Sequence, residues 1–166
     1  MTNIGPYSEP QNFTHMFDIP DIRGTKYKIY NSDSLMGILY TIPEFSKFIY
    51  LVKRANLDTL LDDIEQCFSY TLFIPTDDKY NIDINIDICD ARELVLSCML
   101  NNKITYELLY GYTSGIYPTR FNPNKLLITR NDNKLHVGET YITHPNAIVC
   151  KNGIIHVVDE FIVFRM

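Results

Sequence analysis

The side chains best suited to chemistry in this sequence are His156 and Asp159, which lie in the aliphatic run NGIIHVVDE (152–160). An imidazole beside a carboxylate can act as a general base or hold a metal ion. The same two side chains can instead satisfy hydrogen bonds inside a strand that packs into a core. The spacing of the other candidate residues decides between these alternatives.

The other histidines are scattered, and none forms a HExxH helix or a His-x-His pair that would offer a metal two ligands. They are His15, His136 and His144. The sequence also has no nucleophile elbow, no phosphate-binding loop and no dinucleotide fingerprint. We therefore expect no catalytic residue, no metal site and no cofactor.

Residues 83–90, DINIDICD, alternate Asp and Asn as a calcium loop does. Ile88 and Leu94 stand where an EF-hand needs a glycine and a glutamate, so this interpretation fails. The isoleucines at every second position from 82 to 88 instead predict an extended segment with one buried face and its carboxylates in solvent.

The four cysteines form no CxxC or CxxH cluster, and each has aromatic or aliphatic neighbours. This pattern predicts buried, reduced thiols at Cys67, Cys89, Cys98 and Cys150. A single glycosylation sequon begins at Asn12, and it would carry a glycan only if the chain were secreted.

The composition suits a single soluble domain with a sizeable core: 166 residues, of which 46% are hydrophobic and 21% charged. The net charge of −5 argues against a nucleic-acid binder, which usually has a basic excess. The opening MTNIGPYSEPQNFTHMF has no basic or apolar signal region, and no apolar run is long enough to span a membrane. We expect neither a signal peptide nor a membrane span.

Residues 1–33 contain three prolines and little periodicity, which predicts an extended N-terminal arm with a short strand at 25–30. From residue 34 onward the pattern favours helices, in segments 35–40, 43–56, 59–65, 94–100 and 104–111. The second of these should bury a face of residues spaced i, i+3, i+4 and i+7, namely Phe45, Phe48, Ile49 and Val52.

Several polar residues are predicted to delimit these helices. Ser34 and Asp58 suit caps, Pro43 suits a first helical position, and Asn56 suits a left-handed stop. Asp90 with Glu93 resembles a capping box, and Gly111 should close the last helix.

The C-terminal part predicts two hairpins. One pairs KLLITR with KLHVG around NDN, and the other pairs AIVC with IIHVVDEFIVF around KNG, where Asn152-Gly153 should take positive φ. Helices followed by strands predict an α+β fold in one domain over residues 34–166.

Aromatic side chains concentrate in YELLYGYTSGIYPTRF (106–121). Displayed on a loop, they would serve as contacts for a protein partner, but they could equally fill the core beneath that loop. The residues are Tyr106, Tyr110, Tyr112, Tyr117 and Phe121. A nucleic-acid stacking surface would also need a basic groove, which the sequence lacks.

Two separated segments together resemble the fasciclin domain family. YTLFIPTDDKY (70–80, the first motif) is similar to the family's first conserved box, and NGIIHVVDEFIV (152–163, the second motif) is similar to its second. The matching positions are Thr71, Phe73, Pro75, Thr76, Asp77, Asn152, Gly153, His156 and Asp159. The stretches at 45–63 and 93–105 resemble the family's opening helices and the segment between its boxes.

This resemblance implies a β-sheet wedge or sandwich with N-terminal helices packed along one side. It implies no catalytic role, since members are mostly extracellular adhesion or matrix modules that bind integrins, collagens or other matrix proteins. The sequence departs from the family in having Ser97-Cys98 where members often have Tyr-His, so an adhesive motif that depends on that histidine does not carry over. It also has one domain where tandem copies are common.

The residue pattern of the two motifs suits a structural role. Residues 71–74 read as a strand covered on both faces, Pro75 ends its pairing, and Thr76 and Asp77 offer oxygens to cap the segment after the strand. We expect His156 to be a neutral core residue that links the two motifs by accepting or donating hydrogen bonds, one of them with the first motif. Asp159 should likewise satisfy an internal bond.

The leading functional hypothesis is a non-enzymatic protein–protein interaction or adhesion module. Three features favour a structural component of an intracellular or viral assembly. The cysteines show no pairing pattern, no signal peptide is visible, and the composition is acidic and rich in Ile, Asn and Tyr. One alternative is an extracellular adhesion protein, as in most of the family. Another is a small-molecule binder or an enzyme with a pocket between helices and sheet.

Overall fold

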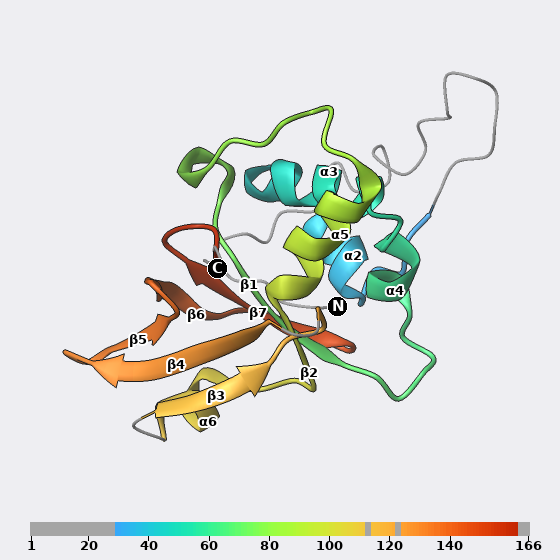
Figure 1. Ribbon diagram of the computed structural model, residues 1–166. Helices are drawn as coiled ribbons and strands as arrows, with labels where there is room; N and C mark the ends of the chain where they lie inside the picture. The colour runs from blue at the N-terminus through green and yellow to red at the C-terminus, as the bar shows by residue number, and fades with distance from the viewer. Residues whose placement is uncertain (1–28, 112–113, 122–123, 163–166) are drawn as a thin grey trace, which may run out of the picture.

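The structure is a computed structural model that describes residues 29–111, 114–121 and 124–162. A helical layer lies on one side of a sheet (Figure 1). Its helices are α2 (Leu35–Leu39), the 3-10 turn η2 (Pro43–Phe45), α3 (Ser46–Arg54), α4 (Asp58–Asp62) and α5 (Ile88–Ser97). Two smaller elements complete the set. The 3-10 turn η3 (Asp77–Lys79) follows β1 in the chain, and α6 (Tyr106–Tyr110) follows β2.

Seven strands form the sheet in the order β2-β1-β7-β6-β5-β4-β3. The parallel pair is β1 with β7, and every other neighbouring pair is antiparallel. The strands are β1 (Tyr70–Ile74), β2 (Met99–Asn101), β3 (Ser114–Pro118), β4 (Lys125–Asn131), β5 (Lys134–Val137), β6 (Thr140–Cys150) and β7 (Gly153–Val158).

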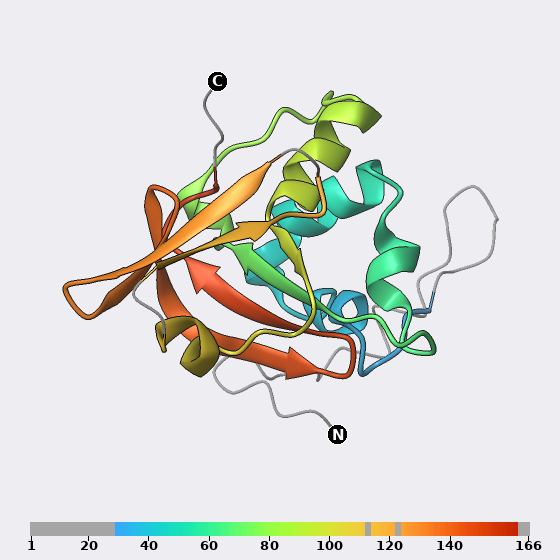
Figure 2. The same cartoon turned by 60° about the horizontal axis from the view of Figure 1, so that its bottom comes forward.

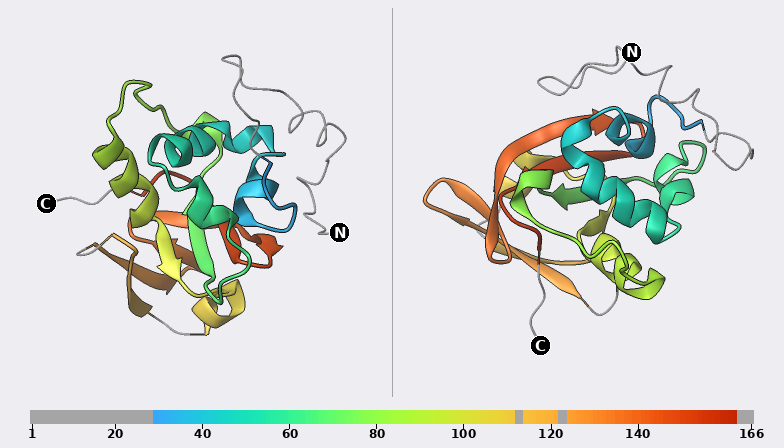
Figure 3. Two further views of the ribbon diagram at one scale, coloured as in Figure 1. Left: turned by 90° about the vertical axis from the view of Figure 1, so that its right-hand side faces the viewer. Right: turned by 90° about the horizontal axis from the view of Figure 1, so that it is seen from above.

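The sheet bends so that its two edges approach each other without closing. Leu100 on β2 forms a bridge with Thr119 just beyond β3, and Arg120 N donates to Met99 O at 2.9 Å. The space between the two halves of the bent sheet is filled by inward-facing side chains, among them Leu126, Ile128 and Val137. The result is a wedge with helices along one side, as the resemblance implied (Figure 3). The predicted α+β class is confirmed.

The centre of the fold is buried on both faces. Every residue of β1 and of β7 is buried, because β6 and β2 flank the pair, the helices cover one face and the bent half of the sheet covers the other. Strands covered on both faces lose the alternation of apolar and polar residues. The predicted helical face of Phe45, Phe48, Ile49 and Val52 is buried against this centre.

Helix ends agree with the sequence at some positions and differ at others. Ser34 Oγ accepts from Gly37 N at 2.9 Å and caps α2, and Asn56 takes the predicted left-handed conformation with φ of 58°. Pro43 opens a 3-10 turn ahead of α3. The predicted cap at Asp58 is wrong, because this residue lies inside α4, where it accepts a hydrogen bond from Tyr30 Oη at 2.8 Å.

The predicted capping box of Asp90 and Glu93 is also wrong. Helix α5 starts earlier, at Ile88, and its N-cap is Asp87, whose side chain accepts from Asp90 N at 2.8 Å. The segment 83–90 is consequently a turn followed by the first helical turn, and it does not form the expected extended segment. Only Ile82 and Ile86 pack against the core, whereas Ile84 and Ile88 are exposed.

Both predicted hairpins are present, with turns that differ in detail. Asp132 and Asn133 take positive φ between β4 and β5. Between β6 and β7 the turn residues are Lys151 and Asn152, and neither they nor Gly153 take the positive φ that the Asn-Gly pair suggested. Gly153 already belongs to β7.

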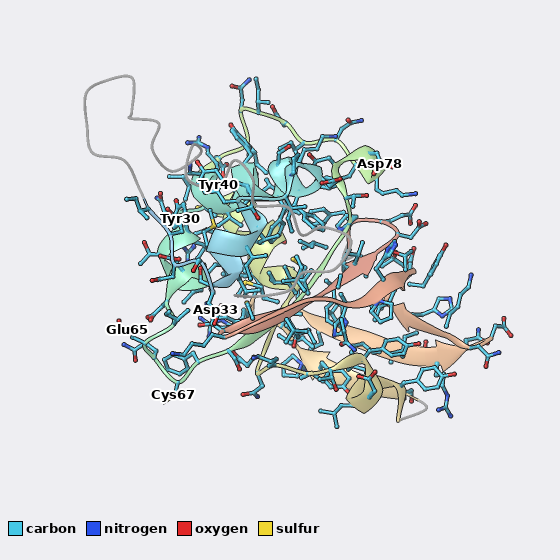
Figure 4. The ribbon with its side chains drawn as sticks, turned by 180° about the vertical axis from the view of Figure 1, so that it is seen from behind. Tyr30, Asp33, Tyr40, Glu65, Cys67 and Asp78 are labelled. Carbon is cyan, nitrogen blue, oxygen red and sulfur yellow. The ribbon has the colours of Figure 1, made fainter. Side chains whose placement is uncertain are left out.

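The cysteines divide into two classes, so the prediction of four buried thiols is wrong for two of them. Cys98 and Cys150 are buried, and burial raises the pKa of their thiols to about 12 and about 11. Cys67 and Cys89 are exposed, and all four are free. Figure 4 shows Cys67 with Glu65 at the tip of the loop that joins α4 to β1.

Most of the predicted arm, with the sequon and most of the strand expected at 25–30, lies outside the described residues. Its last residues contact the helical layer: Tyr30 is buried, and Asn31 N donates to Asp62 Oδ1 at 2.7 Å. The tyrosine ring also packs on Tyr40, with ring centroids 5.4 Å apart (Figure 4). The division of the chain at residue 34 stays a prediction.

Candidate functional site

The two motifs lie side by side at the centre of the sheet. Their strands, β1 and β7, run parallel, with Thr71 paired to Ile154 and Phe73 paired to His156. The rings of Phe73 and His156 stack with centroids 5.5 Å apart. Residues that stand over eighty positions apart in the sequence are therefore direct neighbours.

His156 is completely buried, and its hydrogen bonds determine its protonation. Nε2 lies 2.9 Å from Ile104 O, which can only accept, so this nitrogen carries the proton. Nδ1 accepts from Asn146 N at 3.0 Å and has no room for a second proton. Burial lowers the pKa of His156, although the bond to Ile104 and the charge of Glu107 oppose that shift. His156 is thus a neutral imidazole.

These partners come from the segment between β2 and α6 and from strand β6, and not from the first motif, contrary to expectation. The first motif reaches the same segment through Thr71, whose hydroxyl donates to Asn102 O at 2.7 Å and accepts from Ile104 N at 2.8 Å. Thr71 therefore binds the backbone N–H of Ile104, and His156 binds the backbone carbonyl of the same residue. The segment between β2 and α6 is the link between the motifs.

Asn152 connects the second motif to the helical layer. Its Oδ1 accepts from Leu35 N at 2.8 Å, and its Nδ2 donates to Leu61 O at 2.8 Å and Asp63 O at 3.1 Å. The side chain thus satisfies backbone groups at the start of α2 and the end of α4, which helices leave unpaired. Asn152 is nearly inaccessible to solvent.

Gly153 is required by close packing. A Cβ atom built at this position would lie 2.4 Å from Leu35 Cδ1 and 2.8 Å from Tyr70 O. A side chain there would have to displace the Leu35 side chain of α2 and the backbone of Tyr70 on β1. The glycine of the second motif therefore serves the approach of a helix, since its backbone does not need the freedom of a left-handed turn.

The charged residues of the motifs stabilise the helix and loop around them. Asp77 accepts from Lys47 N at 2.9 Å and from the Ser46 hydroxyl, so it binds the start of α3, a helix that precedes it in the chain. The sequence predicted instead that it would cap the segment after β1. Asp159 Oδ1 pairs with Lys79 Nζ at 3.4 Å.

The remaining motif positions also serve local structure. Pro75 follows the last paired residue of β1, and the hydroxyl of Thr76 donates to Asp78 Oδ1 at 2.6 Å. The polar side chains at the matching motif positions thus have partners inside the molecule, whereas the buried Tyr80 hydroxyl at the end of the first motif has none among the described residues. Over the described part of the chain, no group of three or more His, Cys, Asp or Glu could hold a metal ion.

Among the residues that the structure describes, no helix is both long and apolar enough to cross a membrane.

Asn146, which binds His156, has φ of 50° and accepts from Tyr106 N at 3.0 Å through its side chain. It thereby connects the buried histidine to α6.

The aromatic stretch proposed as a contact surface contains a helix and a strand. Tyr106 and Tyr110 stack on each other in α6 at 5.4 Å, and the Arg130 guanidinium lies 4.9 Å from the Tyr110 ring. Tyr117 and Phe121 are half-buried, and Tyr112 lies outside the described residues. Tyr106, Tyr110 and Tyr117 pack partly on the core and stay partly accessible, so they fit neither interpretation fully.

Sequence reasoning missed the most exposed apolar pair on the sheet. Ile116 and Leu127 are cross-strand partners on β3 and β4, and their side chains are 68% and 50% exposed. We call their side of these two strands, with Pro118 and Lys125, the outer sheet face. If residues 114–118 had been interpreted as a strand, the alternation of side chains would have placed Ile116 on the face of the sheet that Tyr117 does not occupy. Figure 2 shows no helix drawn across β3 and β4.

The model of the Fasciclin domain matches residues 43–164 of this chain. The structure is also similar to a solved FAS1 domain pair from the insect cell adhesion molecule Fasciclin I, with a TM-score of 0.66 and 17% sequence identity. That match covers 79% of this chain and 51% of the other, so this chain spans about half the length of the solved pair. At this identity the likeness shows the fold alone.

Proposed function

Because the chain belongs to the fasciclin domain family, we propose that it is a non-enzymatic protein-interaction module and a structural component of a larger intracellular or viral assembly. Domains of this family are typically adhesion or interaction modules. The motif side chains of His156, Asn152 and Asp77 are hydrogen-bonded inside the fold. This arrangement supports a scaffold whose partners contact other surfaces.

The observation that carries the proposal is the outer sheet face. Ile116 and Leu127 form a contiguous apolar pair on the last two strands of the sheet. Exposed apolar side chains that adjoin one another favour a protein contact, because burying them removes their surface from water. We therefore propose this pair as partner contacts in place of the aromatic residues that the sequence suggested at 106–121.

The proposed compartment rests on the cysteines. All four are free, and the two buried thiols lie at separate places, in the C-cap of α5 and at the end of β6. Free thiols that include the exposed Cys67 and Cys89 suit a reducing environment. Counting four reduced thiols in protein isolated from its source supports this setting. Finding them paired would favour the extracellular alternative.

Capture of partners from source material tests the interaction itself. A tagged full chain should retain specific proteins, and the Ile116→Asp/Leu127→Asp variant should lose them while its melting temperature stays close to that of the parent. Phe68→Asp is the matched control, since Phe68 is 65% exposed on a loop away from this face. Equal retention by both variants would contradict the proposed surface.

A thermal-shift screen separates the module from a small-molecule binder. A ligand that binds only the folded chain raises its melting temperature. No shift is expected with metals, glycans or nucleotides. A reproducible, concentration-dependent rise with one of them would favour the alternative class.

A further inference from the structure

We propose that this chain binds a second copy of itself head to tail, with the loop 81–87 of one copy seated on the outer sheet face of the next. We call residues 81–87 the acidic loop. The inference rests on the proposed function, since it uses the same outer sheet face, and it goes further by naming the partner and the segment that binds.

The acidic loop is held in a defined shape that presents one apolar side chain. Asp83 Oδ1 accepts from Asn85 N at 2.9 Å, and Asp83 O accepts from Ile86 N at 3.0 Å, which closes the turn. Helix α3 supports the loop, since the Tyr50 hydroxyl donates to Ile84 O and Arg54 Nε donates to Ile86 O at 2.6 Å. Its tip is therefore preorganised for contact.

Ile84 is the side chain that this turn leaves in solvent. Ile82 and Ile86 pack toward the core, whereas Ile84 between them is 69% exposed. Asp83 and Asp87 flank it, and Asp87 is also the N-cap of α5. The loop thus presents an isoleucine between two carboxylates.

The outer sheet face has the complementary chemistry. Its apolar pair, Ile116 and Leu127, lies beside Lys125, which is exposed and paired to Pro118 in the strand register. Lys134 on β5 projects from the same face, with its Nζ 4.4 Å from the centroid of the Tyr141 ring. An isoleucine between carboxylates can therefore meet an apolar pair between lysines.

The charge distribution along the chain favours this pairing. Residues 77–93, which contain the acidic loop, have six acidic and two basic side chains. Residues 114–137, which form β3 to β5, have four basic and one acidic side chain. Opposite charges attract the acidic loop to the basic outer sheet face. Like charges disfavour contact between two outer sheet faces.

The two surfaces lie at opposite ends of the molecule. The acidic loop is at the top and β3 and β4 are at the bottom in Figure 1 and in the left view of Figure 3. One copy cannot satisfy both surfaces by itself. A contact between unlike patches on successive copies extends as a chain unless its rotation closes a ring. This geometry suits a structural component.

Sedimentation velocity of the purified full chain tests the proposal. The parent should show species larger than a monomer that grow with protein concentration, and high salt should weaken them by screening the carboxylate–lysine attraction. Ile84→Asp alone and Ile116→Asp alone should each sediment as monomers. Phe68→Asp should behave as the parent does.

A mixture of the two monomeric variants is the decisive measurement. The Ile84→Asp copy keeps an intact outer sheet face, and the Ile116→Asp copy keeps an intact acidic loop. Mixed together they should form a one-to-one dimer that grows no further. A mixture that stays monomeric would overturn the head-to-tail contact, as would a parent chain that is monomeric at every concentration.

A charge exchange tests the same contact without removing apolar side chains. Lys125→Glu should weaken the association, and Asp83→Lys added in the same chain should restore it, because each loop then meets a face of opposite sign. A double variant that associates no better than Lys125→Glu alone contradicts the inference. Melting curves of every variant establish that each is folded.

The outcomes distinguish this inference from the proposed function. If the purified chain never associates but the source capture loses its proteins with Ile116→Asp/Leu127→Asp, the interaction module stands and the second copy is the wrong partner. If self-association depends on Ile116 but not on Ile84, the face is right and the acidic loop is the wrong occupant.

Discussion

Strands β1 and β7 carry both motifs and are buried on both faces, whereas β3 and β4 leave one face in solvent. At the centre, polar side chains such as Asn152 and His156 are bonded to backbone groups inside the fold. At the margin, Ile116 and Leu127 lie opposite each other, and both side chains are exposed. The family signature therefore marks the residues that build this scaffold, and the surface offered to partners lies where the signature is absent.

Removing the Asn152 side chain should give the largest effect. Asn152→Ala removes the partners of two buried backbone groups, Leu35 N and Leu61 O, and of the partly buried Asp63 O, and we expect a loss of about 4 kcal/mol in the free energy of unfolding. Urea unfolding measures it. Asn81→Ala, in the exposed acidic loop, should change stability little. Similar effects for both would remove the distinction between centre and margin.

The link through Ile104 should contribute less. Thr71→Val keeps the shape of the side chain but removes its bonds to Ile104 N and Asn102 O, for an expected cost of about 2 kcal/mol. Thr129→Val on β4 makes the same chemical change on the outer sheet face and is the matched control. Chemical denaturation of the two variants side by side decides, and equal stabilities would contradict the role given to Thr71.

A smaller, pH-dependent effect is expected from His156. Burial lowers its pKa below the ordinary 6.5 in the folded chain, so the unfolded chain binds more protons as the pH falls. Stability should therefore be complete above about pH 6.5 and decrease as the pH falls below it. Unfolding free energies at several pH values measure this slope.

Two variants isolate the histidine responsible for that slope. His156→Gln should flatten it below pH 6.5, whereas His144→Gln, at an exposed position on β6, should preserve it. The idea fails if the slope of His156→Gln equals that of the parent.

The smallest change in stability should come from the outer sheet face. Ile116→Asp is expected to alter the free energy of unfolding by no more than about 0.5 kcal/mol, because the side chain is mostly in solvent already. Thermal unfolding monitored by circular dichroism checks this. A large loss would mean that Ile116 belongs to the core, and the comparison of centre and margin would then have to be redrawn.

Local patterns in the sequence predicted much of the fold. The spacing of Phe45, Phe48, Ile49 and Val52 identified the buried face of a helix, and the NDN turn identified a hairpin. Both are short-range features, in which the residues that define the element lie within it. The resemblance carried by the two motifs added the family and the wedge.

Features that depend on distant neighbours were predicted less well. Alternating isoleucines at 82–88 suggested an extended segment with one buried face, but helix α3 holds the segment as a turn through Tyr50 and Arg54. Asp58 seemed a helix cap, yet Tyr30 binds it inside α4. In both cases the residue is hydrogen-bonded to a distant part of the chain, which the local pattern does not include.

The sequence by itself determined that His156 is a core residue of a family motif, because its aliphatic neighbours require a buried strand. Only the tertiary structure decided which nitrogen carries the proton, since Ile104 and Asn146 come from segments that no local pattern connects to it. The same holds for the surfaces. Whether Ile84 and Ile116 are buried depends on what folds over them, and side-chain burial is a property of the whole packed chain.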